Sequence, residues 1–173
     1  MSAELPGSAP VVVIGAGVHG LSTAWHLARA GTAAVVLDKA QVAAGASGIA
    51  CGVVRNNYFQ PAMSDLMAAC VEIWESQASR LHYHGTGYIA LGPRSQEPDL
   101  VAVAERHERL GYASTLVTGE DAVRRHMHEL YGDWRADGLE VCLHEHRGGY
   151  AFNRESVLGL ADLAREAGAT IFE

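Results

Sequence analysis

Three glycines at positions 15, 17 and 20 have the spacing G-x-G-x-x-G, which is suited to holding a pyrophosphate. Gly15 permits a tight turn, Gly17 lets the backbone approach the phosphates, and Gly20 lets a helix pack closely against the preceding strand. Ala16 and Val18 fall at the start of that helix, where unpaired N–H groups and the helix dipole favour an anion. These five residues are therefore candidate contacts of a dinucleotide cofactor.

The elements that must position these glycines are present in order. Residues 11–14 are an apolar strand, residues 21–30 have a helical pattern, and residues 33–37 predict a second buried parallel strand. Asp38 closes this strand about 20 residues after the glycines, where an acidic side chain can accept hydrogen bonds from a ribose diol. Lys39 either contacts the adenosine end of the cofactor or is solvated. The alternative is a glycine-rich turn in an unrelated α/β protein.

A second glycine-rich loop follows between residues 43 and 52. Its small side chains leave backbone amides unobstructed, as an anion-binding loop requires. The hydroxyl of Ser47 adds a donor, and Arg55 is the first cation after the loop. The candidate contacts within the loop are Gly45, Ala46, Ser47 and Gly48.

Composition limits the partners of the chain. A net charge of −7 over 173 residues argues against a nucleic-acid partner, which would need clustered Lys and Arg. No apolar stretch is long enough for a membrane span, and residues 1–9 form a polar, flexible leader without the basic start of a secretory signal. We therefore expect no membrane partner. The chain has three widely spaced cysteines, which favour a reducing, cytoplasmic location.

The rest of the chain favours an interrupted domain. Helices are predicted over 61–80, 97–110, 119–128 and 154–167, strands over 86–91, 139–144 and 169–173, and a loop over 39–60. The last strand supplies the third parallel strand of a dinucleotide-binding half. We predict an α/β fold, with a Rossmann-like domain of parallel sheet at 10–60 and 148–173 and an inserted α+β segment at 61–147. Because the chain stops on a newly begun core strand, we expect this domain to be incomplete at the C-terminus.

Three H-x-H pairs raise the alternative of a metal site. They are His82 and His84, His126 and His128, and His144 and His146. Zinc sites normally need further Cys, Asp or Glu ligands at local spacings, and no convincing set accompanies these pairs. We predict exposed or core histidines and no metal.

The glycine-rich segments resemble a known family. Residues 15–28 resemble the opening of the D-amino-acid-oxidase-like FAD-dependent oxidoreductases, above all sarcosine oxidase β subunits and dimethylglycine-dehydrogenase-like enzymes. A second block is 44–55, and a looser third block is 148–150 with the helix after it. The resemblance implies bound FAD, with the G-A-S-G stretch at 45–48 and the glycine-containing segment after it running past the pyrophosphate and beneath the flavin. It also implies that residues 61–147 belong to a substrate domain.

The resemblance implies a chemistry as well. The expected substrate is a small secondary or tertiary amine with a carboxylate, such as an N-methylated glycine, and a hydride from its α-carbon or N-methyl group passes to the flavin. Water hydrolyses the imine, and electrons pass on to oxygen or an acceptor protein. An Arg or Lys should anchor the carboxylate. Arg55 is the candidate in this chain, either for the flavin or the substrate carboxylate, and the alternative is a solvated side chain. The catalytic residues stay unknown, because the usual anchors of the family lie largely beyond Glu173.

Two other functions stay open. An NAD-dependent dehydrogenase would share the first strand–helix–strand unit, but regular βαβ repeats should then follow Asp38. A truncated or split cofactor-binding portion would be inactive alone and would require the missing C-terminal portion or partner subunits. An exposed apolar edge at residues 169–172 would support this second alternative.

Overall fold

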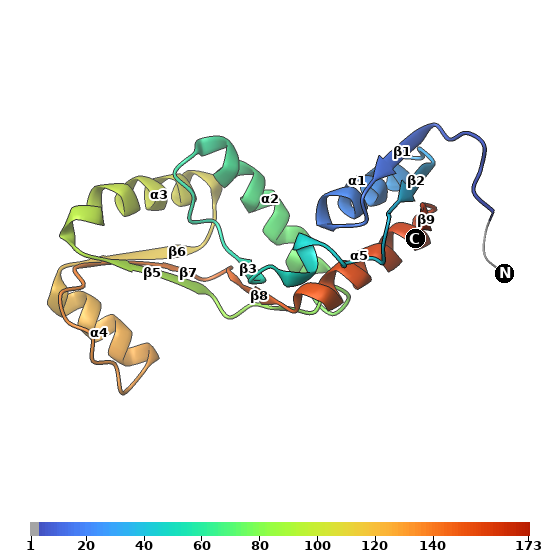
Figure 1. Ribbon diagram of the computed structural model, residues 1–173. Coiled ribbons are helices and arrows are strands. Elements are labelled where there is room, and N and C mark those ends of the chain that lie inside the picture. The colour runs from blue at the N-terminus through green and yellow to red at the C-terminus, as the bar shows by residue number, and fades with distance from the viewer. Residues whose placement is uncertain (1–3) are drawn as a thin grey trace. The chain divides into compact units, whose positions relative to one another are not determined.

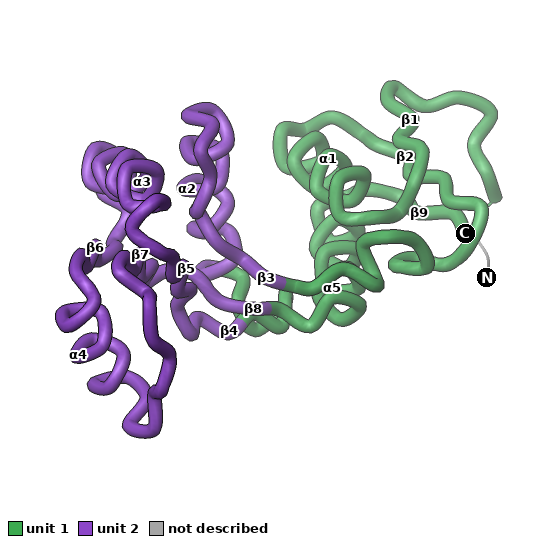
Figure 2. The backbone as a smooth tube through the Cα atoms, turned by 60° about the vertical axis from the view of Figure 1, so that its left-hand side comes forward, with its two compact units in different colours: residues 1–52, 77–83, 151–173 green, residues 53–76, 84–150 purple. Residues whose placement is uncertain are grey.

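A computed structural model describes residues 4–173, and the chain divides into two compact units (Figure 1, Figure 2). Unit 1 contains the chain up to Gly52 together with residues 77–83 and 151–173, and unit 2 contains residues 53–76 and 84–150. Part of the predicted leader, residues 1–3, lies outside the described residues. The roles of the two units as cofactor domain and substrate domain stay predictions.

Unit 1 contains a parallel sheet with the strand order β1-β2-β9. Its elements are β1 (Val11–Ile14), α1 (Val18–Arg29), β2 (Ala34–Leu37), the 3-10 helix η1 (Ala46–Ile49), α5 (Asn153–Glu166) and β9 (Thr170–Phe172). Val35 of β2 lies opposite Val12 on one side and Thr170 on the other, so the third strand is parallel as predicted. The predicted α/β fold with a parallel sheet is therefore confirmed.

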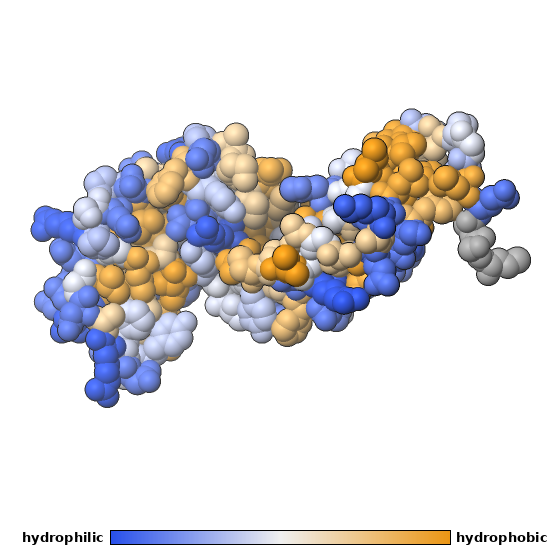
Figure 3. All heavy atoms as spheres, in the orientation of Figure 1, coloured by the Kyte–Doolittle hydropathy of each residue, from blue (hydrophilic) through white to orange (hydrophobic). Residues whose placement is uncertain are grey.

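The two faces of this sheet differ in burial. The side chains of a strand alternate between faces, and Val36 is fully buried on the face where Val13 meets Gly20 of α1. Val12 and Ile14 point to the opposite face and are 51% and 89% exposed. Figure 3 shows apolar surface gathered around β1. Unit 1 thus has one packed face, where α1 and α5 contact each other, and a second face on which the side chains of β1 are exposed while Val35 of β2 is buried.

Unit 2 contains an antiparallel sheet with the order β5-β7-β6 and three helices. Its elements are α2 (Pro61–Ser76), β5 (Tyr88–Gly92), the 3-10 helix η2 (Arg94–Gln96), α3 (Glu97–Leu110), β6 (Ser114–Thr118), α4 (Glu120–Leu130) and β7 (Val141–Glu145). Leu100 of α3 packs in one cluster with Val141 and Leu143 of β7, whereas Met127 of α4 packs in another with Cys142. Because neighbouring residues of a strand face opposite ways, α3 and α4 cover opposite faces of this sheet.

A small further sheet has the order β3-β8-β4. Its strands are β3 (Val53–Val54), β8 (Gly149–Ala151) and β4 (Tyr83–His84). β3 is antiparallel to β8, with Val53 opposite Tyr150.

Some predicted element bounds were wrong. The helix predicted over 61–80 ends at Ser76, residues 77–82 form turns, and the N–H of Tyr83 donates to the carbonyl oxygen of Ala78, five residues back rather than the four of an α-helix. The predicted loop over 39–60 contains η1 and β3, and the strand β6 was missed. No helix within residues 4–173 has the length and apolar character needed to cross a membrane.

Candidate functional site

The G-x-G-x-x-G turn brings strand β1 and helix α1 into close contact. Gly15 has a φ of +103°, a left-handed conformation that glycine adopts without strain, and its N–H donates to the carbonyl oxygen of Leu37 at 2.7 Å. A Cβ atom on Gly20 would overlap the carbonyl oxygen of Gly15. The first and third glycines therefore fulfil the structural roles that their spacing predicts.

The N-terminus of α1 receives a polar side chain from the second glycine-rich loop. Gly17 is the N-cap residue, no side chain of the cap closes the helix, and the first turn carries no acid. The N–H of Val18 instead donates to Oγ of Ser47 at 3.1 Å. A Cβ atom on Gly17 would stand 2.9 Å from the same oxygen. The structure thus brings together the two loops that the sequence predicted to share one ligand.

Asp38 also closes onto the glycine turn. Its Oδ2 accepts the N–H of Ala16 at 2.6 Å, and its Oδ1 accepts the N–H of Ala40 at 2.9 Å. These backbone hydrogen bonds, that of Ala16 first, hold the pKa of the Asp38 carboxyl below its usual range. A carboxylate has about four acceptor positions, so Asp38 can accept further hydrogen bonds. Lys39 beside it is exposed.

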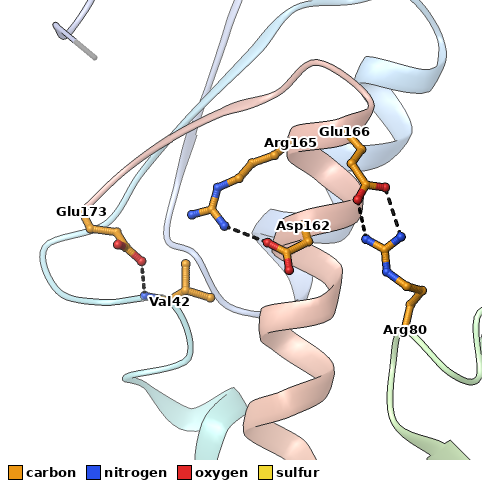
Figure 4. A network of polar contacts seen from close by, with 6 residues as sticks. All are labelled: Val42, Arg80, Asp162, Arg165, Glu166 and Glu173. Carbon is orange, nitrogen blue, oxygen red and sulfur yellow. Dashed lines mark hydrogen bonds and ion pairs between the residues drawn. The ribbon is translucent and has the colours of Figure 1, made fainter. Parts of the chain in front are cut away.

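The loop that carries Ser47 is held by contacts within unit 1. The N–H of Val42 donates to the Glu173 side chain at 2.8 Å, just past β9 (Figure 4). The N–H of Gly48 donates to the carbonyl oxygen of Gly45 at 3.0 Å, and a Cβ atom on Gly48 would overlap the carbonyl oxygen of Ala43. Ala46 begins the short helix η1 in this segment. The turn that presents Ser47 is therefore compact.

The segment 77–83 joins α5 in the same unit. Figure 4 shows Arg80 paired with Glu166 of α5, with nitrogen–oxygen distances of 3.1 and 2.7 Å. The hydroxyl of Ser156 donates to the carbonyl oxygen of Leu81. These contacts support α5, which in turn packs against α1 and η1.

Arg55 lies in unit 2, whereas the other eleven candidate residues lie in unit 1. Its Nη1 donates to the hydroxyl of Tyr88 at 2.7 Å, and its guanidinium carbon lies 5.1 Å from the ring centre of Tyr88 and 5.7 Å from that of Tyr58. Aromatic faces attract a cation at such distances. Arg55 is consequently held in a fixed aromatic setting, and the sequence analysis missed both tyrosines.

The sequence analysis also missed a fully buried polar cluster in unit 2. Oε2 of Glu145 accepts the backbone N–H of Asn56 at 2.6 Å and the hydroxyl of Tyr112 at 3.0 Å. The ring nitrogens of His107 lie 3.0 Å from Oγ of Ser114 and 3.0 Å from the carbonyl oxygen of Asn56. Burial raises the pKa of Glu145 and lowers that of His107. The available signal was an acid at the end of an apolar strand, on the face shared by Val141 and Leu143.

Two of the paired histidines contact each other across unit 2. Nε2 of His126 on α4 lies 3.2 Å from Nδ1 of His144 on β7, and the ring of His144 lies beside that of His146. Burial, followed by the charges of these two neighbours, lowers the pKa of His144. Across residues 4–173, no group of three or more His, Cys, Asp or Glu side chains is arranged to hold a metal ion.

Known proteins resemble this chain over between 61% and 98% of its length. Human peroxisomal sarcosine oxidase is 24% identical over 165 residues, which are 92% of this chain and 41% of that protein. Sarcosine oxidase subunit beta of Rhodobacter capsulatus is 29% identical over 108 residues, 61% of this chain and 24% of that protein. The solved structure of L-proline dehydrogenase from P. horikoshii has a TM-score of 0.86 at 23% identity, covering 98% of this chain and 45% of that one.

This chain therefore spans less than half the length of the relatives it matches. At 23% identity the dehydrogenase structure shows the fold alone, and it agrees with the α/β architecture described above. The family described as FAD dependent oxidoreductase matches residues 10–173, which include the glycine turn, the Ser47 loop and Arg55. The chain belongs to this DAO family of FAD-dependent oxidoreductases.

Proposed function

We propose that unit 1 binds FAD and that the chain contributes to oxidation of a C–N bond in a small amine or amino acid. One observation carries this proposal. The N–H of Ala16, just before α1, donates to Asp38, and the N–H of Val18, the first residue of α1, donates to Ser47, so side chains rather than backbone carbonyl groups accept these two hydrogen bonds. Such N–H groups at the N-terminus of a helix are suited to the phosphate groups of a dinucleotide. The family membership favours FAD over the alternative of NAD.

The residues of unit 1 fit this cofactor by their chemistry. The absence of a Cβ atom on Gly20 lets α1 approach β1 closely, and the first turn of α1 carries no acid, so the helix dipole at its N-terminus favours a phosphate. We propose that Asp38 accepts hydrogen bonds from the ribose and that Lys39 contacts the adenosine end. The remaining proposed contacts of the cofactor are Gly15, Ala16, Gly17, Val18, Gly20, Gly45, Ala46, Ser47 and Gly48.

We further propose that Arg55 binds the carboxylate of the substrate. When bound, the flavin supplies a two-electron acceptor for the hydride of an α-carbon or N-methyl group. An arginine can hold a carboxylate through two parallel hydrogen bonds and so fix the position of the reacting C–H bond. The names of the relatives, sarcosine oxidase and L-proline dehydrogenase, support a substrate that carries both an amine and a carboxylate.

The activity of the whole protein depends on more than this chain. Since the chain spans 41% of the human relative, we propose that further polypeptide, either a C-terminal portion or a partner subunit, completes the catalytic site. The likeness to a sarcosine oxidase β subunit supports a partner subunit. The three cysteines are free, which supports a reducing, cytoplasmic location.

A titration tests FAD binding by the chain itself. FAD is added to the purified protein, its fluorescence is followed, and the visible spectrum is recorded after gel filtration. We expect a retained flavin spectrum for the wild type and an affinity at least about tenfold lower for Gly17→Val, because the side chain would separate the backbone from the phosphates. Gly132→Val is the matched control, since a Cβ atom there meets nothing within 4 Å.

The same titration separates the competing functions. Binding of NADH with no binding of FAD would favour the dehydrogenase alternative and contradict the proposal. Equal binding of FAD by wild type and Gly17→Val would show that the glycine turn is not the site. If the flavin-loaded protein bleaches on anaerobic addition of sarcosine, the amine substrate class is supported as well.

A further inference from the structure

Glu145 is a buried carboxylate that makes no ion pair among the described residues. None of its surface is exposed, and its Oε1 has no hydrogen-bond partner within residues 4–173. The side-chain amide of Asn56 is equally buried, and there too both polar atoms lack a partner. Buried polar atoms without partners each cost stability, so such a group in a folded core calls for a compensating role.

The bonded oxygen of Glu145 fixes the turn that follows Arg55. Oε2 accepts the N–H of Asn56 at 2.6 Å, which is short for a hydrogen bond with an N–H donor. Tyr112 donates to the same oxygen at 3.0 Å and so orients the carboxylate. The residue next to Arg55 is thereby tied to the end of β7.

The carbonyl group of Asn56 is tied to a different element. It accepts a hydrogen bond from Nε2 of His107 on α3 at 3.0 Å, so this nitrogen carries the proton. Nδ1 of His107 then accepts from the hydroxyl of Ser114 at 3.0 Å. Both backbone polar groups of Asn56 are held, one by the sheet and one by the helix, and little freedom remains for the residue before it.

The guanidinium of Arg55 is held by the neighbouring strand. Its partner Tyr88 belongs to β5 and lies opposite Glu145 in the β5–β7 register. The second aromatic ring comes from Tyr58, whose N–H donates to the carbonyl oxygen of Asn56 at 2.9 Å. Asn56 therefore fixes both the backbone of Arg55 and one of the rings beside its guanidinium.

We propose that Glu145 is a positioning residue, which holds Asn56 so that Arg55 is presented between Tyr58 and Tyr88 in the orientation that binds a substrate carboxylate. This inference rests on the proposed role of Arg55. Two parallel hydrogen bonds require a guanidinium plane of fixed direction, so a mobile arginine would lose affinity. The buried carboxylate supplies that rigidity at a cost in stability.

Labelling of arginine by phenylglyoxal tests the proposal on the full chain. The rate at Arg55 is measured by peptide mass spectrometry and divided by the rate at Arg135, which is exposed. Glu145→Ala should raise this ratio about tenfold, as expected when a buried N–H loses its hydrogen-bond acceptor. Glu145→Gln keeps an oxygen acceptor for the N–H of Asn56 and should restore a ratio close to that of the wild type.

A matched control separates positioning from general loosening of unit 2. Leu143 is fully buried on the same strand and face as Glu145, so Leu143→Ala destabilises the same region while the carboxylate remains. We expect an unchanged Arg55 to Arg135 ratio in this variant. A rise equal to that of Glu145→Ala would overturn the proposal, as would a failure of Glu145→Gln to restore the ratio.

A carboxylate probe connects positioning with binding. N-Methylglycine should slow the labelling of Arg55 in the wild type and in Glu145→Gln but not in Glu145→Ala. If it slows labelling in none of the three proteins, the carboxylate role of Arg55 is wrong and this inference falls with it. FAD binding by unit 1 is measured separately by the flavin titration, so failure of one proposal does not hide failure of the other.

Discussion

Asp38 and Glu145 are both carboxylates at the end of a strand, yet their environments oppose each other. Asp38 follows β2, is partly exposed, and accepts two backbone N–H groups that lower its pKa. Glu145 ends β7 and is fully buried, and the loss of solvent raises its pKa despite two hydrogen bonds. The comparison teaches that hydrogen bonds dominate where water still reaches the carboxylate, and desolvation dominates where it does not.

The two environments suit different tasks. A carboxylate in contact with solvent can exchange its partners, so Asp38 is able to accept ligand hydroxyls without leaving a buried charge behind. Glu145 cannot give up its partners without a large penalty, so it is suited to fixing neighbouring groups. Polar atoms near the glycine turn are thus available for a ligand, whereas those around Glu145 belong to the framework of unit 2.

The largest loss of stability is expected from adding a side chain at the close contact in the glycine turn. Gly20→Val places a side chain against the carbonyl oxygen of Gly15, and β1 and α1 must separate. We expect a loss of about 3 kcal/mol in the free energy of unfolding, measured in urea. Gly7→Val is the control, because a Cβ atom at Gly7 meets nothing within 4 Å. Equal stability of the two variants would contradict the contact.

The pH dependence of stability sharpens the comparison at Glu145. Its folded pKa lies above the usual value of 4.5, so its contribution is fully present below that pH and is lost as pH rises through the folded pKa. Glu145→Gln does not titrate. The wild type should therefore lose stability relative to this variant on raising the pH, by on the order of 1 kcal/mol per unit of pKa shift. Urea unfolding between about pH 4 and pH 8 measures the difference in stability between the two proteins. If this difference does not change with pH, the Glu145 carboxyl is not desolvated.

A smaller effect is expected at the N-terminus of α1. Ser47→Ala removes the acceptor of the Val18 N–H, and loss of a capping hydrogen bond costs about 1 kcal/mol. Thermal unfolding of the variant is compared with that of Ser8→Ala, a change at an exposed serine. If both variants have the same midpoint of thermal unfolding, the hydrogen bond from the N–H of Val18 to Ser47 does not stabilise the helix in solution.

The smallest effect on stability is expected at Asp38, the partly exposed carboxylate of the two. The folded pKa of Asp38 lies below its usual 3.8, so its contribution is present above that pH and is lost as pH falls through the folded pKa. Asp38→Asn should therefore be less stable than the wild type near neutral pH and equally stable in acid, which is opposite in sign to the behaviour at Glu145. Acid titration of thermal unfolding for both proteins checks this, and a difference that persists in acid would exclude the ionised carboxylate as its cause.

The sequence predicted the glycine turn, its strand and helix, and the third parallel strand, because local spacing and hydrophobic periodicity determine these features. It also placed Ser47 among the ligand contacts, although it could not show that Ser47 meets Val18 across 29 residues. The Glu145 cluster escaped prediction because its contact with Asn56 joins residues 89 positions apart. β6 was missed since its short alternation of Thr, Leu and Val lies between two stronger helical patterns.

The parallel sheet of unit 1 has a consequence for how the protein matures during synthesis. β2 pairs with β9, so the sheet joins Val35 to Thr170. In the sequence, all of unit 2 lies between these two residues. A growing chain emerges from the ribosome N-terminus first, and closure of so long a loop waits for its far end. We expect unit 2 to gain protection from proteases once Tyr150 has emerged, while β1 and β2 stay vulnerable until Phe172 follows. We therefore expect unit 2 to fold before unit 1.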